Sequence, residues 1–225
     1  MIEARLLRRY KRFLADVELD DGEVRTVHCA NPGRLIGCQE PGSRVLLRDS
    51  GNPARKLRWT WHAVRVGRAW VGVDTALPNR VVREAVEAGR IPELAGYESV
   101  RAEVAYGERS RVDLLLERGS EKAWVEIKCT TLARERVAQF PDAVTARGLK
   151  HLGELSARVA AGERSVQFFF VARPDVDRFQ PADDIDPAYG AGLREAAAAG
   201  VELLAYRSRI NAKEVVLGER IEVEL

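Results

Sequence analysis

Charged residues interrupt two apolar, strand-like segments of this chain, and this feature constrains the fold more than any other. Asp113 lies within segment 112–116, and Glu126 and Lys128 lie within segment 124–128. Side chains alternate between the two faces of a strand, so Glu126 and Lys128 share one face. Such charges inside a sheet are costly unless a metal ion and a phosphate compensate them. The pattern therefore indicates metal-assisted phosphodiester chemistry.

The two interrupted segments are separated by a short, turn-rich stretch at 117–121, which predicts a hairpin. In a matching register, Asp113 and Glu126 lie side by side, because paired strands are about 5 Å apart. Two carboxylates form a hard oxygen site suited to Mg²⁺ or Mn²⁺. Lys128 lies one pleat further, within reach of water or the scissile phosphate, and Glu84 on a preceding helix is a candidate third carboxylate.

A structural interpretation of these charges is also open. Hairpins often carry Glu and Lys on the solvent face, where Lys discourages pairing at a sheet edge. Taken alone, Glu84 is typical of a solvated helix residue, and a pattern as short as Asp-x(12)-Glu-x-Lys has a high false-positive rate. The apolar neighbours of Asp113 favour the catalytic interpretation, since a surface acid rarely lies among valine and leucine.

The first part of the chain predicts a small β-barrel. Turn signals at 20–22, 31–34 and 67–68 separate short β-prone runs. Five strands with tight turns are typical of a barrel of the oligonucleotide-binding (OB) type, which we assign to residues 1–76. The expected strands are residues 10–19, 24–29, 44–47, 59–66 and 69–73.

From residue 77 the pattern changes to alternating helices and strands. Asn79 is positioned to cap a helix that ends at Gly89. Residues 77–225 thus predict a second domain of mixed α/β (α+β) type, with a long surface loop at 173–187. Its expected strands are 100–106, 111–117, 122–128, 166–172 and 201–206, and its further helices are 142–161 and 187–199.

Basic residues are concentrated in patches, although the net charge is only +2. Such patches serve phosphate binding without a high overall charge, and a solvated basic face is an equally good interpretation of either one alone. Aromatic residues interleave the first patch, and barrels of this type bind single strands by charge plus base stacking. The patches comprise Arg5, Arg8, Arg9, Lys11 and Arg12, and Arg55, Lys56 and Arg58.

The expected cellular location and cysteine state follow from the lack of long apolar runs and of Cys-x-x-Cys pairs in the sequence. No apolar run reaches the length of a membrane span, and the first residues lack a signal-peptide core, so we expect a cytoplasmic protein without a membrane partner. Cys29, Cys38 and Cys129 form no Cys-x-x-Cys pair. A Cys29–Cys38 disulfide is conceivable, but buried free thiols fit a cytosolic chain better.

Long motifs on both sides of the charged triplet resemble the sugar fermentation stimulation protein A (SfsA) family. The resemblance covers nearly the whole chain. It implies an N-terminal OB-like domain followed by a restriction-endonuclease-like domain of the PD-(D/E)xK type. The matching blocks are residues 9–16 (RYKRFLAD), 28–33 (HCANPG), 37–38 (GC), 110–113 (SRVD), 125–128 (VEIK), 140–152 (FPDAVTARGLKHL) and 203–206 (LLAY).

The resemblance also implies functions for individual residues. Asp113, Glu126 and Lys128 match the nuclease pattern, with Glu84 as the extra acid; Val112 replaces the proline of the pattern, and Cys129 stands where a small polar residue is expected. The family is described as binding DNA without sequence preference, with a proposed link to sugar (maltose) metabolism.

A basic helical face adds a second candidate surface for nucleic acid. Arg147, Lys150 and His151 are spaced i, i+3 and i+4, so they share one side of a helix. His151 is a weak candidate for a general base. A capped helix with a solvated basic face is the alternative. The full set of candidate nucleic-acid-binding residues is Arg9, Lys11, Arg12, Arg34, Arg147 and Lys150.

Three functions remain in competition. The first is a nuclease that depends on Mg²⁺ or Mn²⁺ and cleaves DNA or RNA. The second is a non-catalytic DNA-binding regulator linked to sugar metabolism, and the third is a small-molecule phosphohydrolase. The intact acid-acid-lysine set favours the nuclease, since a pure binding protein has no need of it. A homodimer is compatible with cutting two strands, and nothing in the sequence establishes one.

Overall fold

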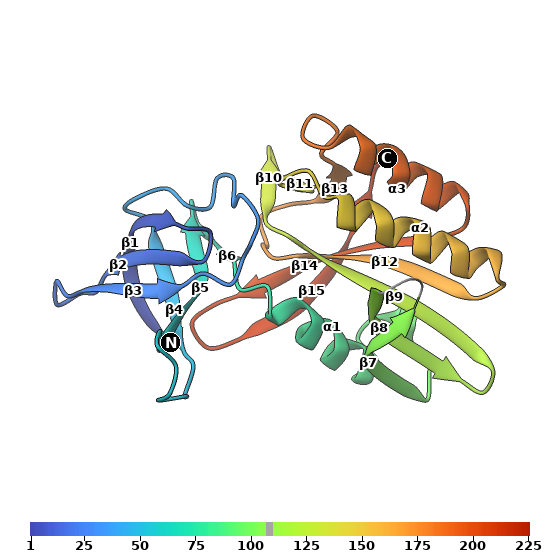
Figure 1. The fold of residues 1–225 in the computed structure, drawn as a ribbon, viewed down its shortest axis with the longest axis horizontal. Coiled ribbons are helices and arrows are strands. Elements are labelled where there is room, and N and C mark those ends of the chain that lie inside the picture. The colour runs from blue at the N-terminus through green and yellow to red at the C-terminus, as the bar shows by residue number, and fades with distance from the viewer. Residues whose placement is uncertain (107–109) are drawn as a thin grey trace.

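The N-terminal part of the chain forms the expected closed barrel, which lies beside a larger domain (Figure 1). The structure, a computed structural model, describes residues 1–106 and 110–225. The strands lie in the order β3-β2-β1-β4-β5, and a β3–β5 pairing closes the barrel. Strand β6 pairs antiparallel with β5. They are β1 (Ile2–Tyr10), β2 (Leu14–Glu18), β3 (Val24–His28), β4 (Arg44–Asp49), β5 (Trp59–Val66) and β6 (Ala69–Gly72).

The first barrel strand differs from the sequence expectation. We expected a strand at 10–19, whereas β1 ends at Tyr10 and the chain then reverses direction. Lys11 and Arg12 have φ angles of 47° and 62°, so both occupy the left-handed region that forms tight turns. In β1 the apolar Ala4 and Leu6 point into the barrel. The intervening arginines concealed this alternation in the sequence.

The second domain is built on a mixed nine-stranded sheet in the order β10-β11-β13-β15-β14-β12-β9-β8-β7. Helix α1 begins at Leu77, directly after the barrel. The remaining elements are β7 (Ser99–Tyr106), β8 (Ser110–Arg118), β9 (Glu121–Thr130), β10 (Leu132–Arg134), β11 (Val137–Phe140), β12 (Arg164–Val171), β13 (Arg178–Pro181), β14 (Glu202–Ile210), β15 (Val215–Val223), α1 (Leu77–Glu87), α2 (Ala146–Ala160), α3 (Pro187–Ala198) and the short 3₁₀ helix η1 (Pro92–Leu94).

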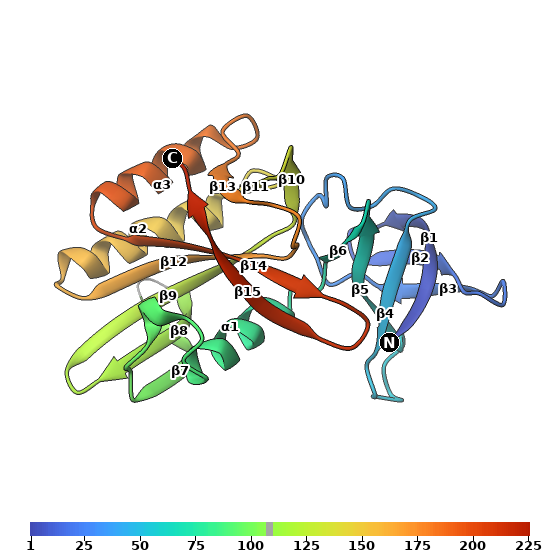
Figure 2. The ribbon, with the colours of Figure 1, turned by 180° about the vertical axis from the view of Figure 1, so that it is seen from behind.

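Helices cover both faces of this sheet (Figures 1 and 2). On one face, apolar residues of α1 pack against Val125, Ile127 and Phe168. On the other face, residues of α2 and α3 pack against Trp124 and Phe169. Neighbouring residues of β9 therefore enter different cores, as strand alternation requires. At β9, which is covered on both faces, no solvated side remains on which charges can be placed freely.

Several elements of the second domain differ from the sequence expectation, which included no strand at β10, β11 or β15. Helix α1 starts two residues before Asn79, so Asn79 is not its cap, and Pro78 occupies the first turn. Helix α2 starts at Ala146, where the Thr145 hydroxyl accepts a hydrogen bond from the Gly148 amide. The expected loop at 173–187 contains β13, which pairs in parallel with β11 and β15. Pairing with distant strands, rather than local preference, fixes β13.

Besides the core inside the barrel, one apolar cluster spans the barrel and the second domain. Leu46 and Ala63 of the barrel belong to the same buried cluster as Ile210 and Leu217 of the β14–β15 hairpin. The Gly72 amide donates to the Ala172 carbonyl at 2.8 Å, and the Ile210 side chain occupies the space that a β-carbon at Gly72 would need. The barrel is therefore packed firmly against the sheet. No helix among residues 1–106 and 110–225 has the length and apolar character needed to cross a membrane.

Candidate active site

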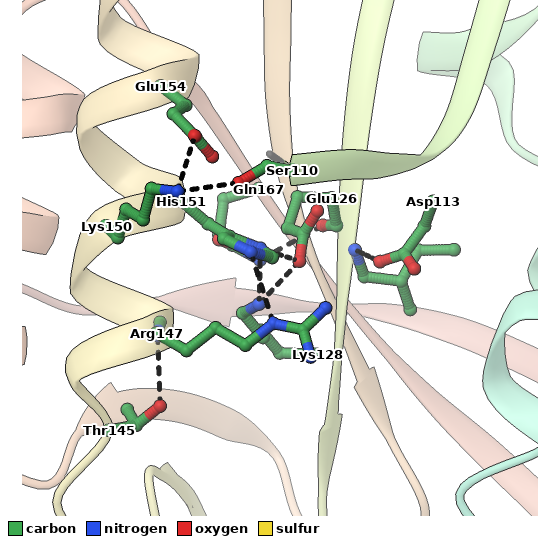
Figure 3. Close-up of polar contacts among 12 residues, drawn as sticks. Ser110, Asp113, Glu126, Lys128, Thr145, Arg147, Lys150, His151, Glu154 and Gln167 are labelled. Atoms are coloured by element: carbon green, nitrogen blue, oxygen red, sulfur yellow. Dashed lines mark hydrogen bonds and ion pairs between the residues drawn. The ribbon is translucent and has the colours of Figure 1, made fainter. Parts of the chain in front are cut away.

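The β8–β9 hairpin brings Asp113 to the charged segment of β9. Its register pairs Leu114 with Val125 and Leu116 with Ala123, and its continuation by one residue would place Asp113 opposite Glu126. The regular ladder ends at this point. Beyond it, the Asp113 carboxylate instead of a backbone carbonyl accepts a hydrogen bond from the Ile127 amide at 2.7 Å (Figure 3). The register aligns the two positions as expected, but the Asp113 carboxylate contacts α1 whereas the Glu126 carboxylate contacts α2, on the other face of the sheet.

Asp113 is held in place from two sides. Its second oxygen accepts a 2.7 Å hydrogen bond from the Asn79 side chain on α1. Burial and the nearby negative charge of Glu126 raise the pKa of Asp113 to about 6, although the hydrogen bonds oppose this shift. The negative charge of Glu126 thus acts on Asp113 through a medium of low polarity. A cation in this position would relieve the repulsion.

Glu126 is almost completely buried, with 3% of its surface exposed. One of its oxygens, Oε1, accepts a hydrogen bond from Lys128 Nζ at 2.6 Å and another from His151 Nδ1. Burial raises the pKa of Glu126, but the bonds from His151 and Lys128 outweigh it and leave the pKa below its ordinary value. The other oxygen, Oε2, is buried and has no hydrogen-bond partner among the described residues. This free oxygen is available to a ligand.

His151 connects Glu126 to the surface of α2. Its Nδ1 faces the Glu126 carboxylate, and its Nε2 accepts from Arg147 Nε at 3.4 Å. A carboxylate only accepts and a guanidinium only donates, so the neutral tautomer protonated at Nδ1 satisfies both contacts. The Arg147 side chain is exposed and extends from α2 toward β9 (Figure 3). This relay fixes the rotamer of Glu126.

Buried polar groups surround Glu126, and some of them have no hydrogen-bond partner among the described residues. Gln167, fully buried on β12, donates to the Glu126 carbonyl at 3.0 Å, while its own side-chain oxygen has no partner among the described residues. Burial and the Glu126 charge raise the pKa of both Tyr106 and Tyr189. These phenols therefore stay neutral beside the carboxylate. Unpaired buried polar groups are uncommon in folded proteins and are a mark of functional sites.

The remaining predicted residues of the second domain occupy different positions. Lys150 lies near the cluster, but its Nζ donates to Ser110 Oγ at 3.2 Å and lies 3.4 Å from Glu154 Oε1 (Figure 3). Glu84 lies on the exposed side of α1 and forms an ion pair with Arg80 at 3.6 Å. The structure therefore does not bring Glu84 to Asp113; Asn79 is the residue of α1 that makes this contact.

The donor set fits a hard divalent cation with few protein ligands. Within residues 1–106 and 110–225, no three His, Cys, Asp or Glu side chains are grouped to hold a metal. Mg²⁺ needs no such cage, because it is commonly bound by one or two carboxylates together with water and substrate phosphates. Asp113 and the free Oε2 of Glu126 are the carboxylate groups that could serve such a cation.

The predicted arginines of the first domain gather at a hollow of about 340 Å³, here termed the arginine hollow. Arg9 belongs to its wall. The Arg9 guanidinium donates to the carbonyls of Asn31 and Gly33 at 2.8 Å each, and to that of Arg12. Arg9 therefore serves mainly to hold the surrounding loop. The hollow is lined by Arg9, Tyr10, Arg12, Pro32, Gly33, Arg34, Gln39 and Ala143.

Sequence reasoning underestimated three residues at the cluster. Asn79 resembled a helix cap, His151 was a weak candidate for a general base, and Gln167 lay unnoticed in an apolar strand. Gln167 had a usable signal, since a lone amide between Val166 and Phe168 is unusual in a buried strand. The three cysteines are free thiols, as expected.

Comparisons with known proteins agree with this architecture. A family model described as "Sugar fermentation stimulation protein RE domain" matches residues 76–214, and one described as "SfsA N-terminal OB domain" matches residues 7–73. The sugar fermentation stimulation protein homolog of Pelobacter propionicus is 54% identical over 225 residues, covering 100% of this chain and 98% of the relative. The homolog of Geobacter sulfurreducens is 55% identical over 218 residues, covering 97% and 94%.

A solved structure resembles the whole molecule. It is described as the structure of Pyrococcus furiosus SfsA in complex with Ca²⁺. It superimposes with a TM-score of 0.92 at 28% sequence identity and covers 100% of this chain and 96% of that chain. The order of a barrel followed by a mixed sheet is thus the same in both. The chain belongs to the sugar fermentation stimulation protein (SfsA) family.

Proposed function

We propose that this chain binds nucleic acid and is a nuclease that hydrolyses phosphodiester bonds with the help of Mg²⁺ or Mn²⁺. The observation that carries the proposal is the buried cluster of Asp113, Glu126 and Lys128, in which one carboxylate oxygen has no partner among the described residues. Keeping two carboxylates in the interior is unfavourable. A resident cation and a bound phosphate would remove the cost, so the arrangement suits catalysis better than stability.

Asp113 and Glu126 would hold the cation. The relative from Pyrococcus furiosus, described as a complex with Ca²⁺, supports a site for a divalent cation in this fold. When bound, Mg²⁺ or Mn²⁺ supplies Lewis-acid polarisation of the phosphate and lowers the pKa of water. The Ile127 amide and Asn79 keep both oxygens of Asp113 oriented, which limits the reorganisation required on binding.

Lys128 would act on the phosphate. Its ammonium group lies 2.6 Å from Glu126 and is mostly shielded from solvent. In such an environment a positive charge stabilises negative charge developing on phosphate oxygens more strongly than it does in water. Arg147, exposed at the start of α2, is placed to contact a neighbouring phosphate. The basic residues of the barrel would bind the nucleic-acid strand at a greater distance from the cluster.

The test is incubation of purified protein with labelled single- and double-stranded DNA and RNA, with Mg²⁺, Mn²⁺ or EDTA. We expect cleavage with either metal and none in EDTA. Lys128→Ala should lower the cleavage rate about 100- to 1,000-fold, as removal of a charge-stabilising donor does in other enzymes. Its matched control is Lys122→Ala, because Lys122 is an exposed lysine of the same strand.

Asp113→Ala is the companion variant, and it should lose metal-dependent cleavage while retaining binding in EDTA. Equal cleavage by wild type, Lys128→Ala and Asp113→Ala would refute the assignment of the site. If the wild type binds nucleic acid but cuts nothing with either metal, the chain is a binding protein, which agrees with the alternative of a DNA-binding regulator.

A further inference from the structure

The arginine hollow lies where the barrel meets the second domain. Its wall combines the β1–β2 turn, the connection between β3 and β4, and Ala143 just before α2. That connection lies against the β10–β11 side of the second domain in both views (Figures 1 and 2). The Leu35 amide fixes it there by donating to Asp142 at 2.8 Å. The lining residues include three arginines and no acidic residue.

The three arginines have different tasks. Arg9 directs its guanidinium at backbone carbonyls and thereby shapes the wall. The guanidinium groups of Arg12 and Arg34 have no hydrogen-bond or ion-pair partner anywhere in the part of the chain that the structure describes. Elsewhere in the barrel, Arg8, Arg44 and Arg58 each pair with a carboxylate. Unpaired guanidinium groups around one hollow are suited to a bound anion.

An exposed aromatic residue directly follows one of these arginines in the chain. Phe13 follows Arg12 in the β1–β2 turn and exposes 45% of its surface. The other aromatic residue of the turn, Tyr10, lines the hollow and is tethered through its hydroxyl to Asp16 at 3.1 Å. Phe13 has no comparable tether. A solvated phenyl ring next to a cation is the combination on which nucleobases stack in single-strand-binding barrels.

We propose that the arginine hollow binds a phosphate of a single-stranded nucleic acid between Arg12 and Arg34, with an adjacent base stacked on Phe13. This inference rests on the proposed function and specifies the form of its substrate. In a duplex the base faces are already stacked on one another, so Phe13 gains a partner only from an unpaired strand. The hollow thereby favours single strands over duplexes.

The position of the hollow directs a bound nucleic-acid strand toward the cluster of Asp113, Glu126 and Lys128. Ala143 of the hollow precedes Arg147 by four residues, so their backbones are at most about 14 Å apart. Arg147 in turn contacts His151, the partner of Glu126. A strand that leaves the hollow along the start of α2 therefore reaches the cluster within a few nucleotides.

Binding measured in EDTA tests this inference without requiring cleavage. The probe is a fluorescein-labelled oligothymidylate of roughly twelve nucleotides, within the site size of such barrels, compared with a duplex of equal length. We expect Arg12→Gln/Arg34→Gln to weaken single-strand binding about tenfold and to reduce its salt slope by about 0.7 for each phosphate that is no longer neutralised. Phe13→Ala should weaken single-strand binding about tenfold and leave duplex binding nearly unchanged.

The control is Arg68→Gln/Arg90→Gln, which removes the same charge from two exposed arginines outside the hollow. Equal weakening by the control and test pairs would overturn the inference, because only overall charge would then matter. Unchanged affinity in Arg12→Gln/Arg34→Gln would also overturn it. So would equal effects of Phe13→Ala on single strands and duplexes, which would remove the stacking role.

Inorganic phosphate, tested at constant ionic strength, separates a strand site from a free-anion site. If phosphate binds in a way that depends on Arg12 and Arg34 while oligothymidylate binding does not, the hollow holds a free anion and the inference fails. Failure of the nuclease proposal gives a different pattern: no cleavage with Mg²⁺ or Mn²⁺, but intact binding that depends on the hollow.

Discussion

At the cluster of Asp113, Glu126 and Lys128, charged side chains are largely shielded from solvent and hydrogen-bonded within the protein, whereas at the arginine hollow two guanidinium groups meet solvent without a partner among the described residues. Glu126 is 3% exposed and bound by Lys128 and His151. Arg12 and Arg34 are exposed and carry no such contacts among the described residues. These hydrogen bonds hold the side chains of the cluster in place without a ligand, which is the preorganisation that the proposed catalysis requires. The hollow keeps its cations free, which suits a substrate that must enter and leave.

Removal of the negative charge at Asp113 is expected to have the largest effect. In the absence of metal, Asp113→Asn should stabilise the protein by about 2–3 kcal/mol above pH 7, because it eliminates a buried carboxylate whose pKa is raised from 3.8 to about 6. The same change should abolish stabilisation by Mg²⁺ or Mn²⁺. Thermal or denaturant unfolding in EDTA and with metal measures both effects.

The pH dependence of this effect has a definite sign. Between pH 4 and 6 the folded wild type holds a proton on Asp113 that the unfolded chain has released, so its free energy of unfolding falls as pH rises through this window. Asp113→Asn should remove that decline. The control is Glu222→Gln, since Glu222 is exposed and has no partner among the described residues. An Asp113→Asn variant that is destabilised at pH 8 would contradict the electrostatic account.

The relay through His151 predicts the next largest effect. His151→Ala should lower the cleavage rate about 10- to 100-fold with little change in KM, because it frees Glu126 to rotate. His151→Gln retains a donor toward Glu126 and should restore part of the activity. Single-turnover and steady-state cleavage separate the two quantities, and Ser156→Ala on the same helix is the control. If Gln is no better than Ala while both stay folded, His151 does not act by positioning Glu126.

The smallest effect is expected at the wall of the hollow. Arg9→Gln should lower the free energy of unfolding by about 1–2 kcal/mol, since it deprives several backbone carbonyls of a charged donor. Arg5→Gln, on the same strand, removes only one hydrogen bond of 3.4 Å and should cost less than about 0.5 kcal/mol. Urea denaturation compares the two. Equal destabilisation by both variants would show that Arg9 has no special structural role.

The barrel could be predicted from the sequence because it leaves local signals, and the acid-acid-lysine positions stay a prediction that rests on signals of the same kind. Short β-prone runs between turns indicate a barrel, and charges within apolar runs such as Val112–Leu116 mark a site. The position of Glu84 could not be predicted in this way. It lies five residues after Asn79, about 140° further around α1, so it points away from the neighbour that Asn79 contacts. Only the packing of the helix decides which residue reaches Asp113.

Contacts between distant segments were equally hidden. His151 and Glu126 are 25 residues apart, and their meeting depends on how α2 lies over β9. The division of labour between Arg9 and Arg12 depends on the left-handed turn after β1, which a run of arginines gives no reason to expect. The sequence thus indicated candidate residue types, whereas tertiary packing determines which of these residues are in contact.

The apolar core shared by barrel and sheet has a consequence for how the molecule holds together. Leu46 and Ala63 face outward from the barrel and are nevertheless fully buried, because α1 and the β14–β15 hairpin cover them. A barrel expressed alone would expose this patch to water and to other chains. The barrel and the second domain are therefore expected to melt in a single cooperative transition, as one folding unit.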